Sequence, residues 1–207
     1  MEWMVVMLVL LICLPKKKKR RPKELGRQGE KTVQNILKRL PGHKVLFHDV
    51  YLPTGREKEL TQIDIVMVWE GGIFCFEVKN YSGLVVGNAY GKEWRQIFRK
   101  KKIPFQNPHH QNYAHVLALT LAIGNQETVK SVVVFAPKTT LRISGAMESD
   151  AVLKWTELKN WKLPPERALT KKQVQEIARC IQKKRLKGKL HKLRHLRQVK
   201  AKSRKQA

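Results

Sequence analysis

The sequence predicts an α/β domain with a mixed central β-sheet flanked by helices. Amphipathic stretches of helical period alternate with apolar runs of strand length in the order helix, strands, helix, strand, helix. Two apolar runs surround Glu70-Gly71-Gly72, a signal for the turn of a β-hairpin. A further apolar run at 129–135 follows a helix, so we expect it to join the sheet as a buried parallel strand.

Composition divides the chain of 207 residues into four parts. An apolar segment at 1–15 precedes a polybasic linker at 16–24, the predicted domain at 25–182 and a basic amphipathic tail at 183–207. The net charge of +27 is concentrated at the ends, where seven and twelve basic residues leave about +8 for everything else. Such ends favour polyanionic partners, either nucleic acid or anionic lipid.

The apolar segment is interpreted as a short membrane anchor. Its twelve uninterrupted apolar residues, Trp3 to Leu14, form about 18 Å of helix, which is short of a hydrocarbon core of about 30 Å. An interfacial segment is therefore the alternative, and the basic run that follows also resembles a nuclear-localisation patch. Because basic residues come after the apolar run, we expect a single-pass or interfacial membrane protein with its domain in the cytoplasm.

The predicted elements have clear boundaries. A helix over 25–40 ends at Pro41-Gly42, and a second one begins at Asn107 and Pro108, a cap and a first-turn proline, and ends before Gly124. Thr170 and Gln173 form a capping box for a last helix. A basic loop is expected at 99–102. Strands are expected at 44–52, 61–69, 72–79, 84–87, 94–98, 129–135, 141–143 and 151–153.

The central hairpin is expected to gather polar side chains on one face. If Trp69 to Gly72 form the loop, the numbers of facing residues sum to 141, so Asp64 lies opposite Glu77 and Gln62 opposite Lys79. Two facing carboxylates repel each other unless a cation lies between them, which a divalent metal would provide. The alternative is an ordinary solvated strand face. The other face carries Ile63, Ile65 and Met67.

These residues resemble a known pattern. Aspartate followed about a dozen residues later by Glu-x-Lys, each on a strand, resembles the PD-(D/E)xK nuclease superfamily, although Ile63 replaces the proline before the aspartate. Five motifs in order between residues 25 and 134 resemble, more narrowly, the nuclease-related domain (NERD). They are Gly26-x-x-Gly29-Glu30, Gln62-Ile63-Asp64, Gly72-Ile73-Phe74, Glu77-Val78-Lys79-Asn80 and Asn107-Pro108-x-x-Gln111-Asn112. The resemblance implies a restriction-endonuclease-like core.

The resemblance also implies a metal-dependent catalytic site. Asp64 and Glu77, with help from Glu30, would hold Mg²⁺ or Mn²⁺ through carboxylate oxygens. Lys79 would orient or deprotonate water, or stabilise the charge that develops on the phosphorus oxygens. Gln111 would position a ligand or the substrate. The residues alone leave two alternatives open. Glu30 is then an exposed acid, and Gln111 is an ordinary polar residue in the first turn of its helix. No zinc site is expected at the histidines of that helix.

Function follows from these expectations. We expect a membrane-tethered protein that processes DNA, rather than RNA, by Mg²⁺-dependent phosphodiester hydrolysis on the cytoplasmic side. The alternative is a non-catalytic protein that binds nucleic acid or anionic lipid on a nuclease-like scaffold. Basic residues after the hairpin are expected to meet phosphates, although such residues are often simply exposed. They are Arg95, Lys100, Lys101 and Lys102.

Overall fold

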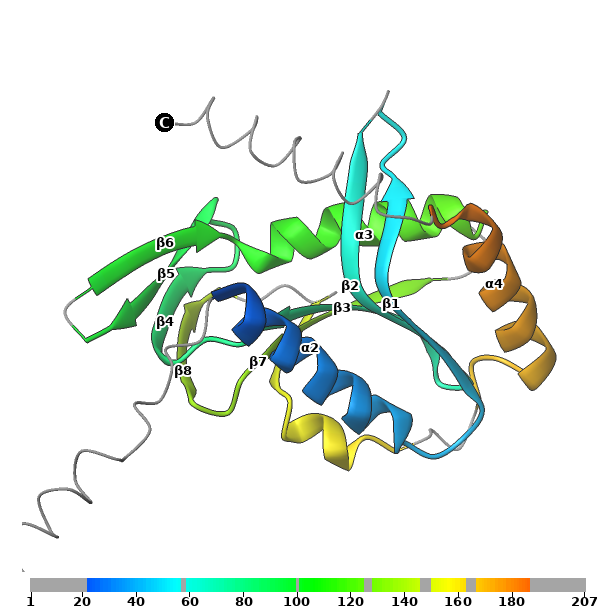
Figure 1. Cartoon of the computed structure of the whole chain (residues 1–207), viewed down its shortest axis with the longest axis horizontal. Helices are drawn as coiled ribbons and strands as arrows, with labels where there is room; N and C mark the ends of the chain where they lie inside the picture. Colours follow the sequence, from blue (N-terminus) through cyan, green and yellow to red (C-terminus); the bar gives the residue numbers. More distant parts are fainter. Residues whose placement is uncertain are drawn as a thin grey trace, which may run out of the picture.

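Two β-sheets lie among three α-helices in the residues that the computed structural model describes, which are 22–56, 59–99, 101–124, 128–145, 150–162 and 167–186 (Figure 1). The larger sheet has the strand order β1 (Lys44–Pro53), β2 (Leu60–Trp69), β3 (Gly72–Lys79), β7 (Val129–Phe135) and β9 (Asp150–Lys154). The smaller sheet has the order β6 (Lys101–Gln106), β5 (Glu93–Phe98), β4 (Gly83–Asn88) and β8 (Thr139–Ser144).

Helices cover both faces of the larger sheet. α2 (Pro22–Lys38) and the short 3-10 helix η1 (Glu157–Asn160) pack on one face, while α3 (Pro108–Ala122) and α4 (Lys171–Lys184) pack on the other. The central strands are therefore buried on both sides, which explains their almost continuous apolar runs. β1, β2 and β3 are antiparallel, whereas β7 and β9 continue the sheet in parallel. The predicted α/β class with a mixed sheet is confirmed.

The smaller sheet was not predicted. It packs on β7 through a core of its own, in which Val85 and Trp94 meet Val133 and Phe135. The prediction of a basic loop at 99–102 is also partly wrong, because Lys101 and Lys102 already belong to β6. Segments that looked like short, isolated strands thus assemble into a second sheet, in which β4 and β8 pair in parallel.

The register of the β2–β3 hairpin is as predicted. Ile65 pairs with Phe76, and Trp69 pairs with Gly72 across a two-residue turn. Gly72 has φ 123°, a conformation that side chains rarely adopt, so glycine is required there. The ladder ends at Ile65 and does not include the neighbouring Asp64. Asp64 instead accepts a hydrogen bond at its own Oδ2 from the backbone N–H of Val78, at 2.9 Å.

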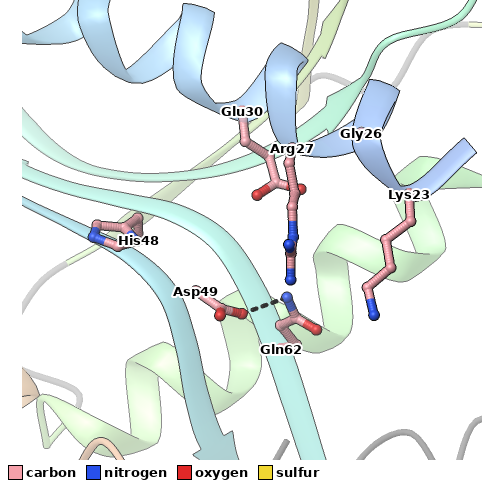
Figure 2. Close-up of a pocket in the computed structure, with 7 residues that line it drawn as sticks. All are labelled: Lys23, Gly26, Arg27, Glu30, His48, Asp49 and Gln62. Atoms are coloured by element: carbon pink, nitrogen blue, oxygen red, sulfur yellow. Dashed lines mark hydrogen bonds between the residues drawn. The ribbon is translucent and has the colours of Figure 1, made fainter. Parts of the chain in front are cut away.

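Along β2, side chains stop alternating regularly between the two faces of the sheet at the point where β2 and β3 separate. Ile65 packs on the α2 side, but Ile63 packs on the α3 side, so the expected common face of these residues is wrong. The neighbouring strand β1 is also irregular at this level, because Asp49 has φ 51°, which is outside the range of an extended strand. Gln62 accordingly does not face Lys79. Its Nε2 donates to Oδ1 of Asp49 at 2.6 Å, beside α2 (Figure 2).

The membrane localisation expected from the sequence is corrected. Throughout the described ranges, no helix combines the length and the apolar composition needed to cross a bilayer. The apolar segment at 3–14 that motivated the expectation lies outside those ranges, as do 16–21 and 187–207.

A close contact fixes α2 against the end of β3. Nδ2 of Asn80 donates to the backbone oxygen of Leu25 at 2.7 Å, which holds the first turns of α2 in place. Gly29 faces the same asparagine, and a Cβ atom at Gly29 would lie only 2.7 Å from Cβ of Asn80. The Gly-Glu motif of α2 and the asparagine after Glu-x-Lys therefore share one packing role, which places Glu30 near the end of β3.

This contact predicts that Gly29→Ala lowers the free energy of unfolding by about 1–3 kcal/mol, because the added methyl group forces α2 away from Asn80. The matched control is Gly26→Ala on the same helix, where an added Cβ meets no atom within 4 Å. The control should be neutral, or stabilising by up to about 1 kcal/mol, because alanine is the better helix former. Chemical denaturation of both variants measures the difference, and equal stability of the two would contradict the packing role.

Candidate functional site

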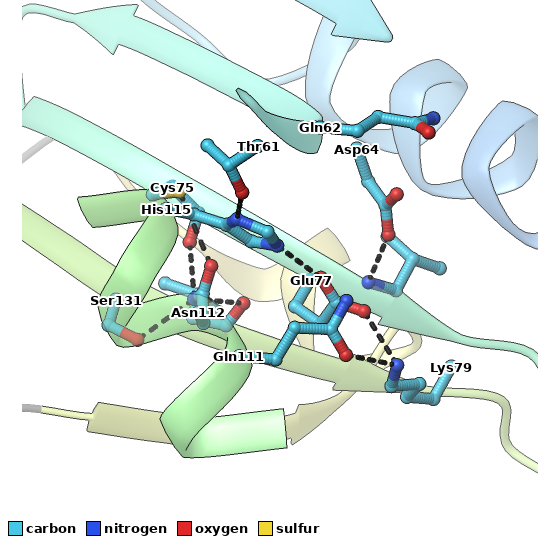
Figure 3. Close-up of polar contacts among 12 residues, drawn as sticks. Thr61, Gln62, Asp64, Cys75, Glu77, Lys79, Gln111, Asn112, His115 and Ser131 are labelled. Carbon is cyan, nitrogen blue, oxygen red and sulfur yellow. Dashed lines mark hydrogen bonds and ion pairs between the residues drawn. The ribbon is translucent and has the colours of Figure 1, made fainter. Parts of the chain in front are cut away.

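Polar side chains converge where β2 and β3 separate (Figure 3). Glu77 is only 2% exposed, and apart from Lys79 at its end the strand that carries it is otherwise apolar. Its Oε1 accepts a hydrogen bond from Nζ of Lys79 at 2.6 Å, and its Oε2 lies 3.2 Å from Nε2 of His115. A carboxylate that leaves water needs such partners, because an uncompensated buried charge is strongly destabilising.

The start of α3 supplies the second element of the site. Nζ of Lys79 also donates to Oε1 of Gln111 at 2.9 Å. The helix begins at Pro108, and the side chain of Asn107 accepts the N–H of His109 at 2.9 Å, so Asn107 is the N-cap. Capping fixes the helix start, and Gln111 follows one turn later, which explains the Asn-Pro-x-x-Gln spacing.

Glu77 and Lys79 form an ionised pair. Burial by itself raises the pKa of Glu77, but the Lys79 ammonium and the His115 side chain outweigh burial and lower this pKa to about 2. Burial likewise opposes the charge on Lys79, yet the Glu77 carboxylate raises the pKa of Lys79 above its ordinary value. At neutral pH the lysine is therefore a permanent cation and the glutamate a permanent anion.

Asp64 has the opposite electrostatic environment. Burial raises its pKa well above the ordinary value, and the nearby carboxylates of Glu77 and Glu30 raise it further. The N–H of Val78 and the charge of Lys79 favour the ionised form but do not reverse the shift. The site thus holds more negative charge than its own cations balance.

An open pocket of about 440 Å³ lies between α2 and the bend of the β1–β2 pair. Glu30, Arg27 and Lys23 line it from α2, and Asp49 and Gln62 line it from the strands (Figure 2). Both signs of charge therefore meet in one solvent-accessible hollow, next to the carboxylate excess around Asp64.

The donor atoms suit a hard divalent cation. Asp64, Glu77 and Glu30 offer carboxylate oxygens, which Mg²⁺ prefers, and a cation would relieve the charge excess at Asp64. As the described residues stand, no three His, Cys, Asp or Glu side chains are arranged to hold one metal together. Glu77 is engaged by Lys79 and His115 instead. The chemistry of the donors fits the ion, and their arrangement is not a closed coordination shell.

Comparison with known proteins identifies the family. The model of the nuclease-related domain (NERD) family matches residues 25–136, which is more than half of the chain. The chain belongs to the nuclease-related domain family. The match begins in α2 and ends just after β7, so it includes every residue predicted for the catalytic site.

A relative and a structural comparison complete this picture. An uncharacterised protein of Bacillus anthracis is 39% identical over 126 residues, which are 60% of this chain and 59% of that protein. The chain therefore spans about three fifths of the length of this curated relative. No solved structure matches the chain.

The nuclease-related domain brings some of the predicted site residues together and separates others. Glu77, Lys79 and Gln111 form one hydrogen-bonded group, and Asp64 lies beside it (Figure 3). Glu30 faces the pocket on the α2 side. The predicted phosphate-binding residues lie apart on the smaller sheet, where Arg95, Lys101 and Lys102 are exposed, and Lys100 lies outside the described residues. The predicted roles of all these residues stay predictions.

His115 is the site residue that the sequence did not reveal. It is 4% exposed, and its Nδ1 lies 2.6 Å from Oγ1 of Thr61 while its Nε2 faces Glu77. His115 follows Gln111 by four residues and so shares its helix face, and this spacing was the available signal. Asn112 was also missed. Its Nδ2 donates to the backbone oxygen of Cys75 and to Oγ of Ser131, which ties α3 to β3 and β7.

The charge excess predicts that Asp64→Asn stabilises the metal-free protein by on the order of 1 kcal/mol at pH 7. A raised folded-state pKa means that folding favours the protonated carboxyl, so the stabilising contribution of Asp64 is present at low pH and is lost as the pH rises. Asparagine keeps an oxygen for the Val78 N–H but never carries the charge. Chemical denaturation in the presence of a chelator should show a higher free energy of unfolding for the variant than for wild type at neutral pH, and no difference below about pH 3.9.

Glu77→Gln is the matched comparison, with the opposite sign. The folded-state pKa of Glu77 is lowered to about 2, so its stabilising charge is present above about pH 4.3 and is lost as the pH falls toward 2. Its removal leaves Lys79 without a counter-charge and should cost about 3 kcal/mol at neutral pH. Destabilisation of both variants at pH 7 would contradict the excess of negative charge at Asp64.

Proposed function

We propose that this nuclease-related protein hydrolyses phosphodiester bonds of DNA with the help of Mg²⁺ or Mn²⁺. The observation that carries the proposal is the charge pattern at the end of β3. Asp64 lies in an excess of negative charge directly beside the ion pair of Glu77 and Lys79. A purely structural role gives no reason to keep this destabilising excess next to Glu30, which lines an open pocket, whereas a site for a cation and a phosphate does.

Asp64, Glu77 and Glu30 are the residues that would hold the metal. When bound, the ion polarises a phosphoryl oxygen and lowers the pKa of water. Glu30 comes from α2, and the contact between Gly29 and Asn80 sets its position relative to β3. The three carboxylates therefore depend on three separate elements for their alignment.

Lys79 is assigned to charge stabilisation rather than to proton abstraction. Its raised pKa keeps the amine protonated at neutral pH, and a protonated amine has no lone pair with which to take a proton from water. A fixed ammonium instead stabilises the negative charge that develops on the phosphorus oxygens. Gln111 accepts one of its hydrogens and so orients the Nζ group.

The pocket beside Asp64 offers a place for the substrate. Lys23 and Arg27 line this pocket opposite Asp49, and both can pair with phosphate oxygens. Glu30 lines the same pocket and also raises the pKa of Asp64, so it connects the pocket with the buried carboxylates. A nucleic-acid backbone in this pocket would thus meet these cations and Glu30, a proposed metal ligand, at the same time.

One observation favours a second candidate, a non-catalytic protein that binds nucleic acid. Glu77 already has Lys79 and His115 as partners, so the buried pair is electrostatically satisfied without any metal. A nuclease-like core retained as a scaffold would keep this pair for stability alone. Binding of the metal distinguishes the two candidates.

We predict metal-dependent cleavage of DNA by the full chain, with rates at least 100-fold lower in Glu77→Gln and in Lys79→Met. The first substitution removes a proposed ligand, and the second removes the cation at similar volume. Glu176→Gln on the exposed face of α4 is the matched control and should cut like wild type. Circular dichroism checks folding, and cleavage at the wild-type rate in both site variants would overturn the assignment.

Calorimetric titration with Mn²⁺ should detect binding that Asp64→Asn weakens at least tenfold, because the variant loses a charged oxygen ligand. Glu176→Gln again serves as the control and should bind like wild type. If no binding depends on Asp64, the scaffold function is favoured instead. The denaturation experiment on Asp64→Asn checks that the variant is folded, so that loss of binding is not caused by unfolding.

A further inference from the structure

The smaller sheet, at the end of the molecule opposite α4 (Figure 1), extends beyond its own core. Its strand β5 is paired with β4 on one side and with β6 on the other, so β5 presents two faces rather than a free edge. Trp94 and Phe105 lie opposite each other in the β5–β6 ladder, and both pack in the core on β7. We call the side of the sheet that carries these two residues the inner face.

Farther along the strands, the inner face carries apolar side chains that are exposed to solvent. Because side chains alternate between faces along a strand, Phe98 lies on the same face as Trp94, four residues earlier. Ile103 likewise shares the face of Phe105. Trp94 is fully buried, whereas Phe98 is 43% exposed and Ile103 is 48% exposed. The inner face therefore changes from a packed core to an open apolar surface within one sheet.

This open surface is continuous with the candidate site through Tyr81. The ring of Tyr81 meets the ring of Phe105 edge-on at a centroid distance of 4.9 Å. Tyr81 is also close enough to Lys79 to interact with it electrostatically. Ile103 precedes Phe105 by two residues, which places it about 7 Å farther along β6. A ligand that reaches from Lys79 to Ile103 can thus follow the inner face throughout.

The two faces of the smaller sheet differ in charge. Lys101 lies opposite Phe98 in the ladder, so its cation belongs to the inner face. Among the described residues of the four strands, the one acid is Glu93, which lies on the opposite face. Arg95 and Lys102 also lie on that opposite face. Of the described cations predicted to meet phosphates, Lys101 is therefore the one beside the open apolar surface.

An exposed aromatic ring beside cations suits the bases of a single strand. Such bases stack on aromatic and arginine side chains, while the phosphates pair with nearby cations. Phe98 supplies the ring, and Cζ of Arg99 lies 5.6 Å from its centroid. A duplex hides the faces of its bases, and four strands about 4.8 Å apart are broader than a major groove of about 12 Å. The inner face consequently favours unpaired nucleotides over a duplex.

We propose that the inner face of the smaller sheet binds a single-stranded segment of the nucleic acid that leads to the candidate site. Phe98 and Ile103 contact the bases, and Lys101 contacts a phosphate. The inference rests on the proposed function for nucleic acid as the partner, and it adds that the strand beside Lys79 is unpaired. Binding to this face needs neither metal nor cleavage, so the two proposals can fail separately.

The test is fluorescence anisotropy with the full chain in a chelator and three labelled DNA ligands. They are a single strand of 20 nucleotides, an abasic strand of the same length and a duplex of 20 base pairs. The abasic strand has the phosphates but not the bases, so it measures binding by charge alone, including that of the basic chain ends. Phe98→Ala should weaken binding of the single strand about tenfold, because a stacked base loses its partner. Binding of the other two ligands should stay within about twofold of wild type.

The opposite face of the same sheet provides matched controls. Val86 is 37% exposed and lies on that face, so Val86→Ala should bind all three ligands like wild type. Lys101→Gln should reduce the slope of log K against log salt on the single strand by about 0.7, because one phosphate contact is lost. Lys102→Gln removes the same charge from the neighbouring residue and should leave this slope unchanged.

Circular dichroism checks that each variant is folded. Unchanged binding of the single strand by Phe98→Ala, or equal losses on the single strand and on the abasic strand or duplex, would overturn the proposal. Equal effects of the two lysine variants would overturn it as well, since net charge alone would then explain binding. The same holds if Phe98→Ala changes the oligomeric state in sedimentation without weakening the single strand, because the face would then bind a second copy of the chain.

Discussion

The buried carboxylate of Glu77 is the constraint to which the surrounding structure responds. An ionised group in the middle of an apolar sheet is tolerated only with close partners, and Lys79 and His115 provide them from β3 and α3. Lys79 in turn engages Gln111, whose place depends on the cap at Asn107. The start of α3, the end of β3 and the ion pair of Glu77 and Lys79 therefore form one cooperative unit. Loss of one member leaves the remaining polar groups without their partners.

Stability and chemistry oppose each other in this unit. The pair at Glu77 stabilises the folded chain, whereas the carboxylate of Asp64 is placed where burial and two neighbouring acids disfavour its charge. Natural proteins accept such local costs mainly where function requires them. The apolar cores on both faces of the larger sheet provide the surplus stability that makes the cost tolerable. The site lies where the β2–β3 ladder ends, and there the backbone N–H of Val78 donates to the side chain of Asp64.

Local patterns allowed much of the fold to be predicted. The hairpin register followed from a two-residue turn, and the helix starts followed from Asn107 with Pro108 and from the capping box at Thr170. Long-range geometry was not accessible in this way. The break of alternation at Asp64 depends on the conformation of the neighbouring strand at Asp49, so Gln62 and Ile63 were placed on the wrong faces. The second sheet required the pairing of β4 with β8, whose paired residues, such as Gly83 and Thr139, lie 56 positions apart in the chain. His115 was considered only as a zinc ligand and was not predicted for this site, because its partner, Glu77, is distant in sequence.

The parallel edge strands have a consequence for the size of the folding unit. β8 pairs with β4, β9 pairs with β7, and both lie beyond residue 136, where the family match ends. A fragment trimmed at that residue would leave two naked strand edges, one in each sheet. It would also lose α4, whose Val174, Ile177 and Ala178 help close one core. Unpaired edges recruit strands from neighbouring molecules, so such a fragment is expected to aggregate.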